Sequence, residues 1–258
     1  MLERFQDEDG FVGYRSPLLT AQGIPHLFTT RIGGRGRHEL DLGRLDPRQM
    51  ERVARAAGLA GARLVSVEQV HGARVLVVPR DALPGLAQEA DGLVSERDDV
   101  LVGVHVADCV PVLLARSDGR RVAAVHAGWR GLVAGVIPRA LELLGPGRIA
   151  AALGPCLSRA HFEVGPEVVA AFAHAGLGAA IHERAGLRAQ IDLGAAAAQQ
   201  LAAGGVRLVD RSDRCTYAHD QEFYSYRRDV THGGRGHTGR LAALIAAAPE
   251  RRAPRRST

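Results

Sequence analysis

The stretch VLVGVHVADCVPVLLA, residues 100–115, is the most informative part of this 258-residue chain for its fold. It is dense in valine, as strands buried on both faces of a sheet are. His105 and Asp108 interrupt it, and it is too short and too polar to span a bilayer. It therefore predicts buried strand structure and no membrane association.

Further strand and helix patterns are interleaved along the chain. Because the strands come in groups, the pattern favours an α+β fold, a single domain with mixed β-sheets flanked by helices. For the first long helix, Asp46 is the expected N-cap, Pro47 the first helical residue and Gly58 the stop. Strands are expected at residues 63–70, 73–79, 120–129, 148–155, 206–210 and around 223–226, and helices at 46–58, 131–144, 166–173, 191–203 and 241–248.

No internal boundary divides the chain, so one domain is expected to cover residues 1–258. Its core is expected at about 26–247, and the basic tail 249–258 is expected to be disordered. The hydrophobic content of 46% is that of an ordinary globular protein.

The basic balance of the chain does not indicate a nucleic-acid partner. The net charge is +5 and the pI is about 9.7, which would normally raise that possibility. However, the chain contains no lysine and no asparagine, so all 33 basic residues are arginines, and they are spread along the chain. This skew is typical of coding bias, and we expect no nucleic-acid binding.

The three cysteines, Cys109, Cys156 and Cys215, are too few and too scattered for a disulfide framework. The acidic N-terminus lacks the apolar segment of a signal peptide, so a cytoplasmic protein is expected. The sequence leaves open whether it is a monomer or a weak homodimer.

Three segments place a metal-ligating side chain after an apolar run: SVEQVHG with His71, HVADC with Cys109, and AAVHAGWRG with His126. Any one of these residues taken alone is more typical of a buried core. Together they form a set of two imidazoles and one thiolate, which suits zinc or copper. Three protein ligands leave a fourth position open, as in catalytic zinc sites.

Two other interpretations of these residues stay open. Cys156 or Cys215 can supply a fourth ligand, which would make the site structural. Alternatively, Cys109 and His126 can form a nucleophile–base pair.

Several arginines are candidates for binding an anion. Arg130 follows Gly128 at the expected start of a helix; the alternative is that the glycines only permit a tight turn. Arg31 precedes a glycine-rich loop. Arg227 and Arg228 follow Tyr226, a pattern that suits stacking on a base and binding an anion, but equally a solvated face.

Nine motifs occur in a fixed order from about Phe28 to Ile245: QVHG, ADGLVS, ADCVPVLLA, AAVHAGWRGLVAGV, ALGPC, FEVGPEV, RCT, FYSYRRD and TGR. With this array the chain resembles the YfiH-like, laccase-domain family, also called multicopper polyphenol oxidoreductases and the peptidoglycan editing factor family. The resemblance implies an α+β fold with mixed sheets and one metal ion bound by His71, Cys109 and His126.

The resemblance also implies an activity. Family members phosphorolyse the purine nucleosides adenosine, inosine, guanosine and methylthioadenosine, and they deaminate adenosine. Purine nucleosides and inorganic phosphate are therefore the expected partners. Editing of peptidoglycan precursors that carry a wrong first amino acid is a related role in the family.

The chain departs from the family pattern in two places. The usual R-x-G-G-V-S and S-L-N-L-G are replaced by RIGGRGRHELDLG, residues 31–43, so Asp41 stands where asparagine is usual and the loop is shorter. Extra residues, VTHGGRGH, precede the TGR motif. Both changes bear on the rim of the expected pocket.

Roles follow for the candidate site residues. One zinc ion is expected, and copper could take the same site. A multicopper cluster is disfavoured, because the 11 histidines include no His-x-His pair and the only methionines are Met1 and Met50. Asp108 is expected to orient a ligand or transfer a proton. The phosphate candidates are Arg130, Arg227 and Arg228, and the other substrate contacts are Arg31, Asp41, Gln69 and Tyr226.

Three alternative functions stay open at this point. They are an amide hydrolase that edits peptidoglycan precursors, a copper-dependent polyphenol oxidase, and a non-enzymatic metal-binding module.

Overall fold

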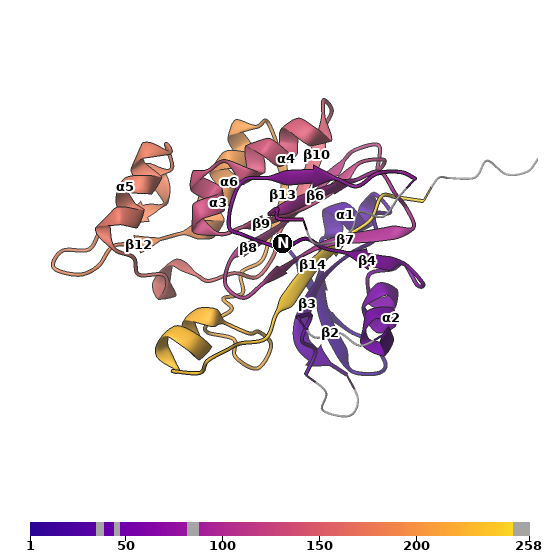
Figure 1. The fold of residues 1–258 in the computed structure, drawn as a ribbon, viewed down its shortest axis with the longest axis horizontal. Helices are drawn as coiled ribbons and strands as arrows, with labels where there is room; N and C mark the ends of the chain where they lie inside the picture. Colours follow the sequence, from indigo (N-terminus) through magenta and orange to yellow (C-terminus); the bar gives the residue numbers. More distant parts are fainter. Residues whose placement is uncertain (35–38, 44–46, 82–87, 250–258) are drawn as a thin grey trace, which may run out of the picture.

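The computed structural model describes the whole chain except residues 35–38, 44–46, 82–87 and 250–258. Two six-stranded sheets lie face to face, with helices on their outer sides (Figure 1). The predicted α+β fold with mixed sheets is therefore confirmed. The expected N-cap Asp46 and nearly all of the basic tail lie outside the described residues.

The first sheet contains both the N-terminal strands and the last strand of the chain. Its strands are, in spatial order, β1 (Glu3–Gln6), β2 (Phe11–Arg15), β3 (His26–Gly33), β14 (Leu241–Ile245), β7 (Val100–Val106) and β4 (Arg63–Val65). All neighbours are antiparallel except β4 and β7, which are parallel. The strands β1 and β2 precede the predicted core at 26–247, yet they extend the same sheet.

The second sheet is also mixed. Its strands are, in spatial order, β13 (Leu208–Arg211), β10 (Ile149–Leu153), β8 (Val110–Arg116), β9 (Val122–Ala127), β6 (Gly92–Ser95) and β5 (Val75–Val77). The outermost pairs on both edges are parallel and the inner pairs are antiparallel. A separate small ladder joins β11 (Ile181–His182) and β12 (Gln190–Ile191).

Three hydrophobic clusters hold four layers together. One cluster lies between the sheets, a second between the first sheet and α2, and a third between the second sheet and the helices that include α4 and α6. The helical segments are α1 (Pro17–Ala21), α2 (Pro47–Ala56), α3 (Trp129–Val133), α4 (Val136–Leu144), η1 (Arg159–His161), α5 (Pro166–His174), η2 (Gly178–Ala180), α6 (Leu193–Ala203) and the π-helical turn η3 (Arg227–His232). No described helix is long and apolar enough to cross a membrane.

The valine-rich stretch 100–115 forms two strands that belong to different sheets. Its first half is β7 in the first sheet and its second half begins β8 in the second sheet. The short turn between them contains Asp108 and Cys109. The connection between β4 and β5 passes between the same two sheets. Two connections therefore cross from sheet to sheet in the part of the molecule that holds the metal-ligating residues.

Two of the predicted elements are wrong. Residues 241–248 were expected to form a helix, but Leu241–Ile245 is the strand β14 between β3 and β7. Every residue of this strand is buried, so it shows no alternation, and a short run of leucine and alanine does not distinguish a buried strand from a helix. Residues 223–226 form no strand; they lead into η3.

Other elements were predicted with different bounds. The helix expected at 131–144 is divided into α3 and α4 by Gly135, whose φ is +81°. The strand expected at 63–70 ends at Val65. Helix α2 begins at Pro47, as predicted, and Gly58 follows its end with φ +86°.

Candidate metal centre

The three predicted metal ligands meet where the chain crosses between the sheets. His71 lies in the connection from β4 to β5, Cys109 in the turn from β7 to β8, and His126 in β9. One ligand atom from each lies within 4.8 Å of the other two. The rings of His71 and His126 meet edge to face, with centroids 4.7 Å apart. Only His126 is part of a strand; the other two lie in the loops that follow strands.

The backbone is strained at this centre. His71 has φ +61° and Asp108 has φ +98°, and no other non-glycine residue in the described part of the chain has a positive φ. Such conformations cost on the order of 1–3 kcal/mol each and persist where the surroundings enforce them. Gly128 closes the third side, because a Cβ there would lie 3.0 Å from the Cys109 Sγ and 3.1 Å from the His71 Cδ2. The close approach therefore favours glycine, because any larger residue would push the Cys109 and His71 side chains outward.

Asp91, which the sequence reasoning missed, holds two of the ligands in place. Its buried carboxylate lies 2.8 Å from the Nδ1 of His126 and accepts hydrogen bonds from the backbone N–H groups of His71 (2.9 Å) and Gly72 (2.6 Å). The backbone carbonyl of Asp91 also accepts from the His126 N–H. An acidic residue directly before the apolar run Gly92–Ser95 was the signal available in the sequence.

The electrostatics of the cluster suit a cation. Burial raises the pKa of the Cys109 thiol, but the charge of His126 and hydrogen bonds from His126 and His71 outweigh it and lower the pKa below its usual value. Burial alone would raise the pKa of Asp91. The hydrogen bonds from His126 and Gly72 have the larger effect, so the pKa of Asp91 lies below its usual value. An ionised Asp91 accepts the Nδ1–H of His126 and leaves Nε2 free to bind a metal. Two imidazoles and a thiolate in this arrangement fit zinc or copper.

A cavity of about 600 Å³ opens onto the cluster. Four of the predicted site residues other than the ligands line it, namely Gln69, Asp108, Tyr226 and Arg227. The wall also contains residues that were not predicted: the apolar or aromatic Val67, Val106, Ala107, Trp129, Leu157, Phe162 and Leu193, and the polar His105, Thr231 and Arg240.

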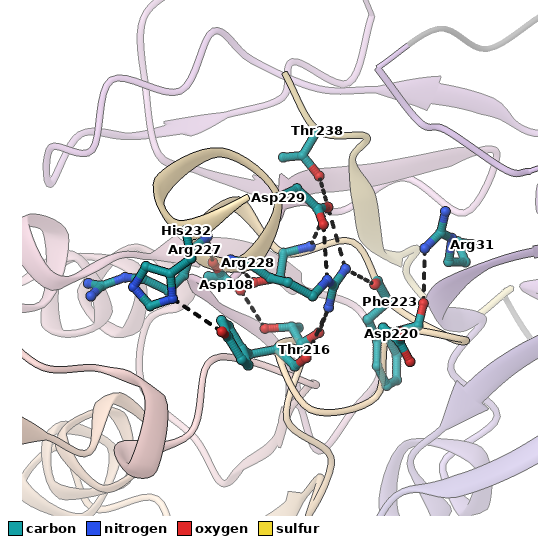
Figure 2. Close-up of polar contacts among 12 residues, drawn as sticks. Arg31, Asp108, Thr216, Asp220, Phe223, Arg227, Arg228, Asp229, His232 and Thr238 are labelled. Atoms are coloured by element: carbon teal, nitrogen blue, oxygen red, sulfur yellow. Dashed lines mark hydrogen bonds and ion pairs between the residues drawn. The ribbon is translucent and has the colours of Figure 1, made fainter. Parts of the chain in front are cut away.

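Gln69 and Asp108 use their side chains to hold the site together. The Gln69 amide donates to the His105 carbonyl and accepts from the His105 N–H, both at 2.7 Å, which ties the His71 loop to β7. The buried Asp108 carboxylate accepts from the Thr216 hydroxyl at 2.6 Å and from the Arg227 N–H at 2.7 Å (Figure 2). Gln69 therefore holds the loop of His71, and Asp108 holds the turn of Cys109.

The guanidinium of Arg228 bonds to groups of the segment in which Arg228 lies. Its guanidinium pairs with Asp229 at 2.9 Å and donates to the backbone carbonyls of Thr216, Tyr217 and Phe223 (Figure 2). The guanidinium holds the segment that carries η3 in shape, so the phosphate role expected for it has no support in this geometry.

Three predicted substrate contacts do not line the cavity. Arg31 pairs with Glu39 and donates to the Asp220 carbonyl (Figure 2). Asp41 accepts from the backbone N–H groups of Gly43 and Arg240. Arg130 is exposed and stacks on the Trp129 ring at 4.3 Å.

The remaining cysteines do not join the ligand group. Cys156 and Cys215 are free thiols whose backbones pair with each other in an isolated bridge. Among the described residues, the group that can hold a metal consists of His71, Cys109 and His126 alone. A fourth protein ligand, and with it a closed structural site, has no support there.

The chain is an α+β protein in which two histidines and one cysteine that could hold a metal ion lie together at the wall of a cavity. The chain belongs to the family described as multi-copper polyphenol oxidoreductase laccase, whose family model matches residues 25–248. This finding confirms the resemblance seen in the sequence motifs.

Curated relatives in this family match nearly the whole chain. A purine nucleoside phosphorylase of Deinococcus radiodurans is 39% identical over 245 residues, which cover 89% of this chain and 92% of the relative. The purine nucleoside phosphorylase YfiH of Escherichia coli is 37% identical over 236 residues, covering 87% and 94%.

Two solved structures have a similar fold. The Neisseria meningitidis protein NMB0706 has a TM-score of 0.75 at 33% identity, with 88% of this chain and 95% of that one covered. YlmD from Geobacillus stearothermophilus has a TM-score of 0.80 at 26% identity, covering 95% and 99%.

Proposed function

We propose that this protein is a zinc-dependent purine nucleoside phosphorylase that acts on adenosine, inosine, guanosine and methylthioadenosine and also deaminates adenosine. One observation carries the proposal: the ligand group, an apolar and aromatic wall and two arginines share a single cavity. Relatives named purine nucleoside phosphorylases, such as that of Deinococcus radiodurans, support it.

The walls of the cavity suit the parts of the substrates. A purine base is flat and largely apolar, and it packs well against Phe162, Leu157 and the exposed ring of Tyr226. Inorganic phosphate needs a cationic partner, which Arg227 or Arg240 can supply.

The reactions place separate demands on this site. In phosphorolysis a phosphate oxygen bonds to C1′ of the ribose while the glycosidic bond breaks, and its electron pair leaves with the base, which takes up a proton. In deamination a water oxygen bonds to C6 of adenine and ammonia leaves. A zinc ion held by His71, Cys109 and His126 supplies Lewis acidity and an open coordination position. Asp91 keeps His126 oriented, and Asp108 keeps the turn of Cys109 against the opposite wall.

Copper can occupy the same three ligands, but multicopper oxidase chemistry needs further ligand groups. The described residues offer one group of this kind. Neither methionine lines the cavity: Met1 is at the chain terminus and Met50 is on α2. We therefore propose zinc as the resident metal.

Product analysis tests the proposal. Zinc-loaded protein is incubated with inosine and phosphate, and ribose 1-phosphate and hypoxanthine are expected. With adenosine, the release of adenine reports phosphorolysis and the release of inosine reports deamination. If no nucleoside is converted, the phosphorylase proposal is wrong, and an amide hydrolase acting on peptidoglycan precursors is the next function to assay. Cys109→Ala is the inactive control.

A further inference from the structure

Arg240 places a guanidinium at the cavity wall that forms no ion pair with a described carboxylate. Its guanidinium donates to two neutral carbonyls, those of Thr238 (3.0 Å) and Gly239 (3.3 Å). The nearby Asp41 carboxylate accepts from the backbone N–H of Arg240, not from its side chain. Within the described parts of the chain, no carboxylate pairs with this guanidinium. A half-buried cation with no ion-pair partner among the described residues therefore borders the cavity.

The ring of His105, four residues before the ligand Cys109, lines the same cavity. Its Nε2 is buried and has no hydrogen-bond partner among the described residues. Burial, and after it the charge of Arg240, lowers the pKa of His105, so the ring is neutral at pH 7 and carries one N–H donor. A buried polar atom without a partner costs free energy, and a ligand that completes the ring's hydrogen bonding recovers it.

The other cavity arginine, Arg227, also donates to a carbonyl and forms no ion pair with a described carboxylate, but its guanidinium lies at a different part of the wall. The guanidinium of Arg227 lies over the ring of Phe162, 5.3 Å from its centroid, and donates to the Glu163 carbonyl. It therefore extends the aromatic surface that suits the base. Arg240 and His105 form a polar side of the cavity with one full positive charge and one neutral donor.

We propose that inorganic phosphate binds at this side, with the Arg240 guanidinium as its charge partner and the His105 N–H as a further donor. This inference rests on the proposed phosphorolysis and gives it a phosphate site. It replaces Arg130, which is outside the cavity, and Arg228, which is paired with Asp229. A phosphate dianion accepts several hydrogen bonds and pairs well with the planar guanidinium.

The main test is Arg240→Gln in the zinc-loaded, full-length protein. Inorganic phosphate is titrated by calorimetry with and without hypoxanthine, and the KM for phosphate is measured at saturating inosine. Phosphate binding should weaken by about 10- to 100-fold, while the KM for inosine changes by less than about threefold. Arg207→Gln, an exposed arginine outside the cavity, is the matched control for the loss of one charge.

The possible results distinguish failure of the proposed phosphate site from failure of the proposed phosphorylase function. If Arg240→Gln binds phosphate as the wild type does, the proposed site is wrong even if phosphorolysis occurs. If phosphate binding falls in this variant but the wild-type protein cleaves no nucleoside, the site stands and the proposed function is wrong. Should Arg240→Gln fail to fold, Arg240→Lys keeps the charge without the planar donor pair and is expected to bind phosphate with intermediate affinity.

His105 is tested by a pair of variants. His105→Phe keeps a flat ring without a donor and should weaken phosphate binding by about 3- to 10-fold. His105→Gln keeps a donor and should restore part of that loss. Equal phosphate affinities for the wild type and His105→Phe would exclude the ring as a donor.

Discussion

The two sides of the cavity are built by different means. On the metal side, the ligands are held by strands of both sheets and by the single carboxylate of Asp91. On the other side, the segment from Arg214 to Arg240 adds no strand to either sheet. It is held by the side chains of Asp108, Arg228 and Asp229 (Figure 2), by backbone hydrogen bonds such as that from the Arg31 N–H to the Glu222 carbonyl, and by burial of Phe223. The polar contacts of Asp91 serve one side, and those of Arg228 and Asp229 serve the other, so mutations should affect the two separately.

The largest effect is expected for Cys109→Ala, which removes the only thiolate of the ligand group. Zinc affinity should fall by more than about 100-fold, because loss of a direct ligand exceeds the 10- to 100-fold typical of supporting residues. Competition with a chelator measures it. Cys156→Ala, a thiol outside the group, should keep wild-type affinity. Zinc retained at full affinity by Cys109→Ala would remove the basis for the metal centre.

Asp91→Asn comes next. The amide keeps one acceptor but presents an NH2 group where His126 and two backbone amides now donate. Zinc affinity should fall by about 10- to 100-fold. Asp118→Asn, in an exposed turn, serves as the control. A change of less than about threefold would mean that the strands alone fix the ligands.

The smallest effect is expected for Thr216→Val on the opposite side. It removes the 2.6 Å hydrogen bond to Asp108 at a buried position while keeping the shape of the side chain. The free energy of unfolding in urea should fall by about 1–2 kcal/mol, with zinc affinity within about threefold of the wild type. Thr20→Val, at an exposed position of α1, is the control. Parallel losses of stability and zinc affinity would show that the two sides act as one unit.

The sequence predicted the residues that form this cluster because their capacity to bind a metal is a property of the residue type. His71, Cys109 and His126 stand out wherever they fold, and the order of the flanking motifs linked them. Asp91 was missed because its role depends on two backbone amides and a ring that only the fold brings to it. Neighbourhood in sequence was also misleading: Arg130 follows the ligand His126 closely but is outside the cavity.

The same limit applies to the fold. Helices α5 and α6 were predicted at 166–173 and 191–203; the first begins at Pro166 as expected, and the second begins two residues late because Asp192 is its N-cap. Strand β14 was not predicted, because the sequence Leu241–Ile245 does not indicate that β3 and β7 lie on either side of it. Gly135 divides the helix expected at 131–144 because it adopts a left-handed conformation, which the apolar pattern around it does not predict.

The crossings from β4 to β5 and from β7 to β8 have a consequence for assembly of the molecule. His71 and Cys109 lie on separate crossings and His126 lies in the second sheet, so the ligand set is complete only after the sheets have docked. An ion held by all three residues therefore acts as a removable cross-link that joins distant loops of the chain. Unlike a disulfide, this cross-link strengthens with the concentration of free metal, so thermal stability becomes a measure of metal supply.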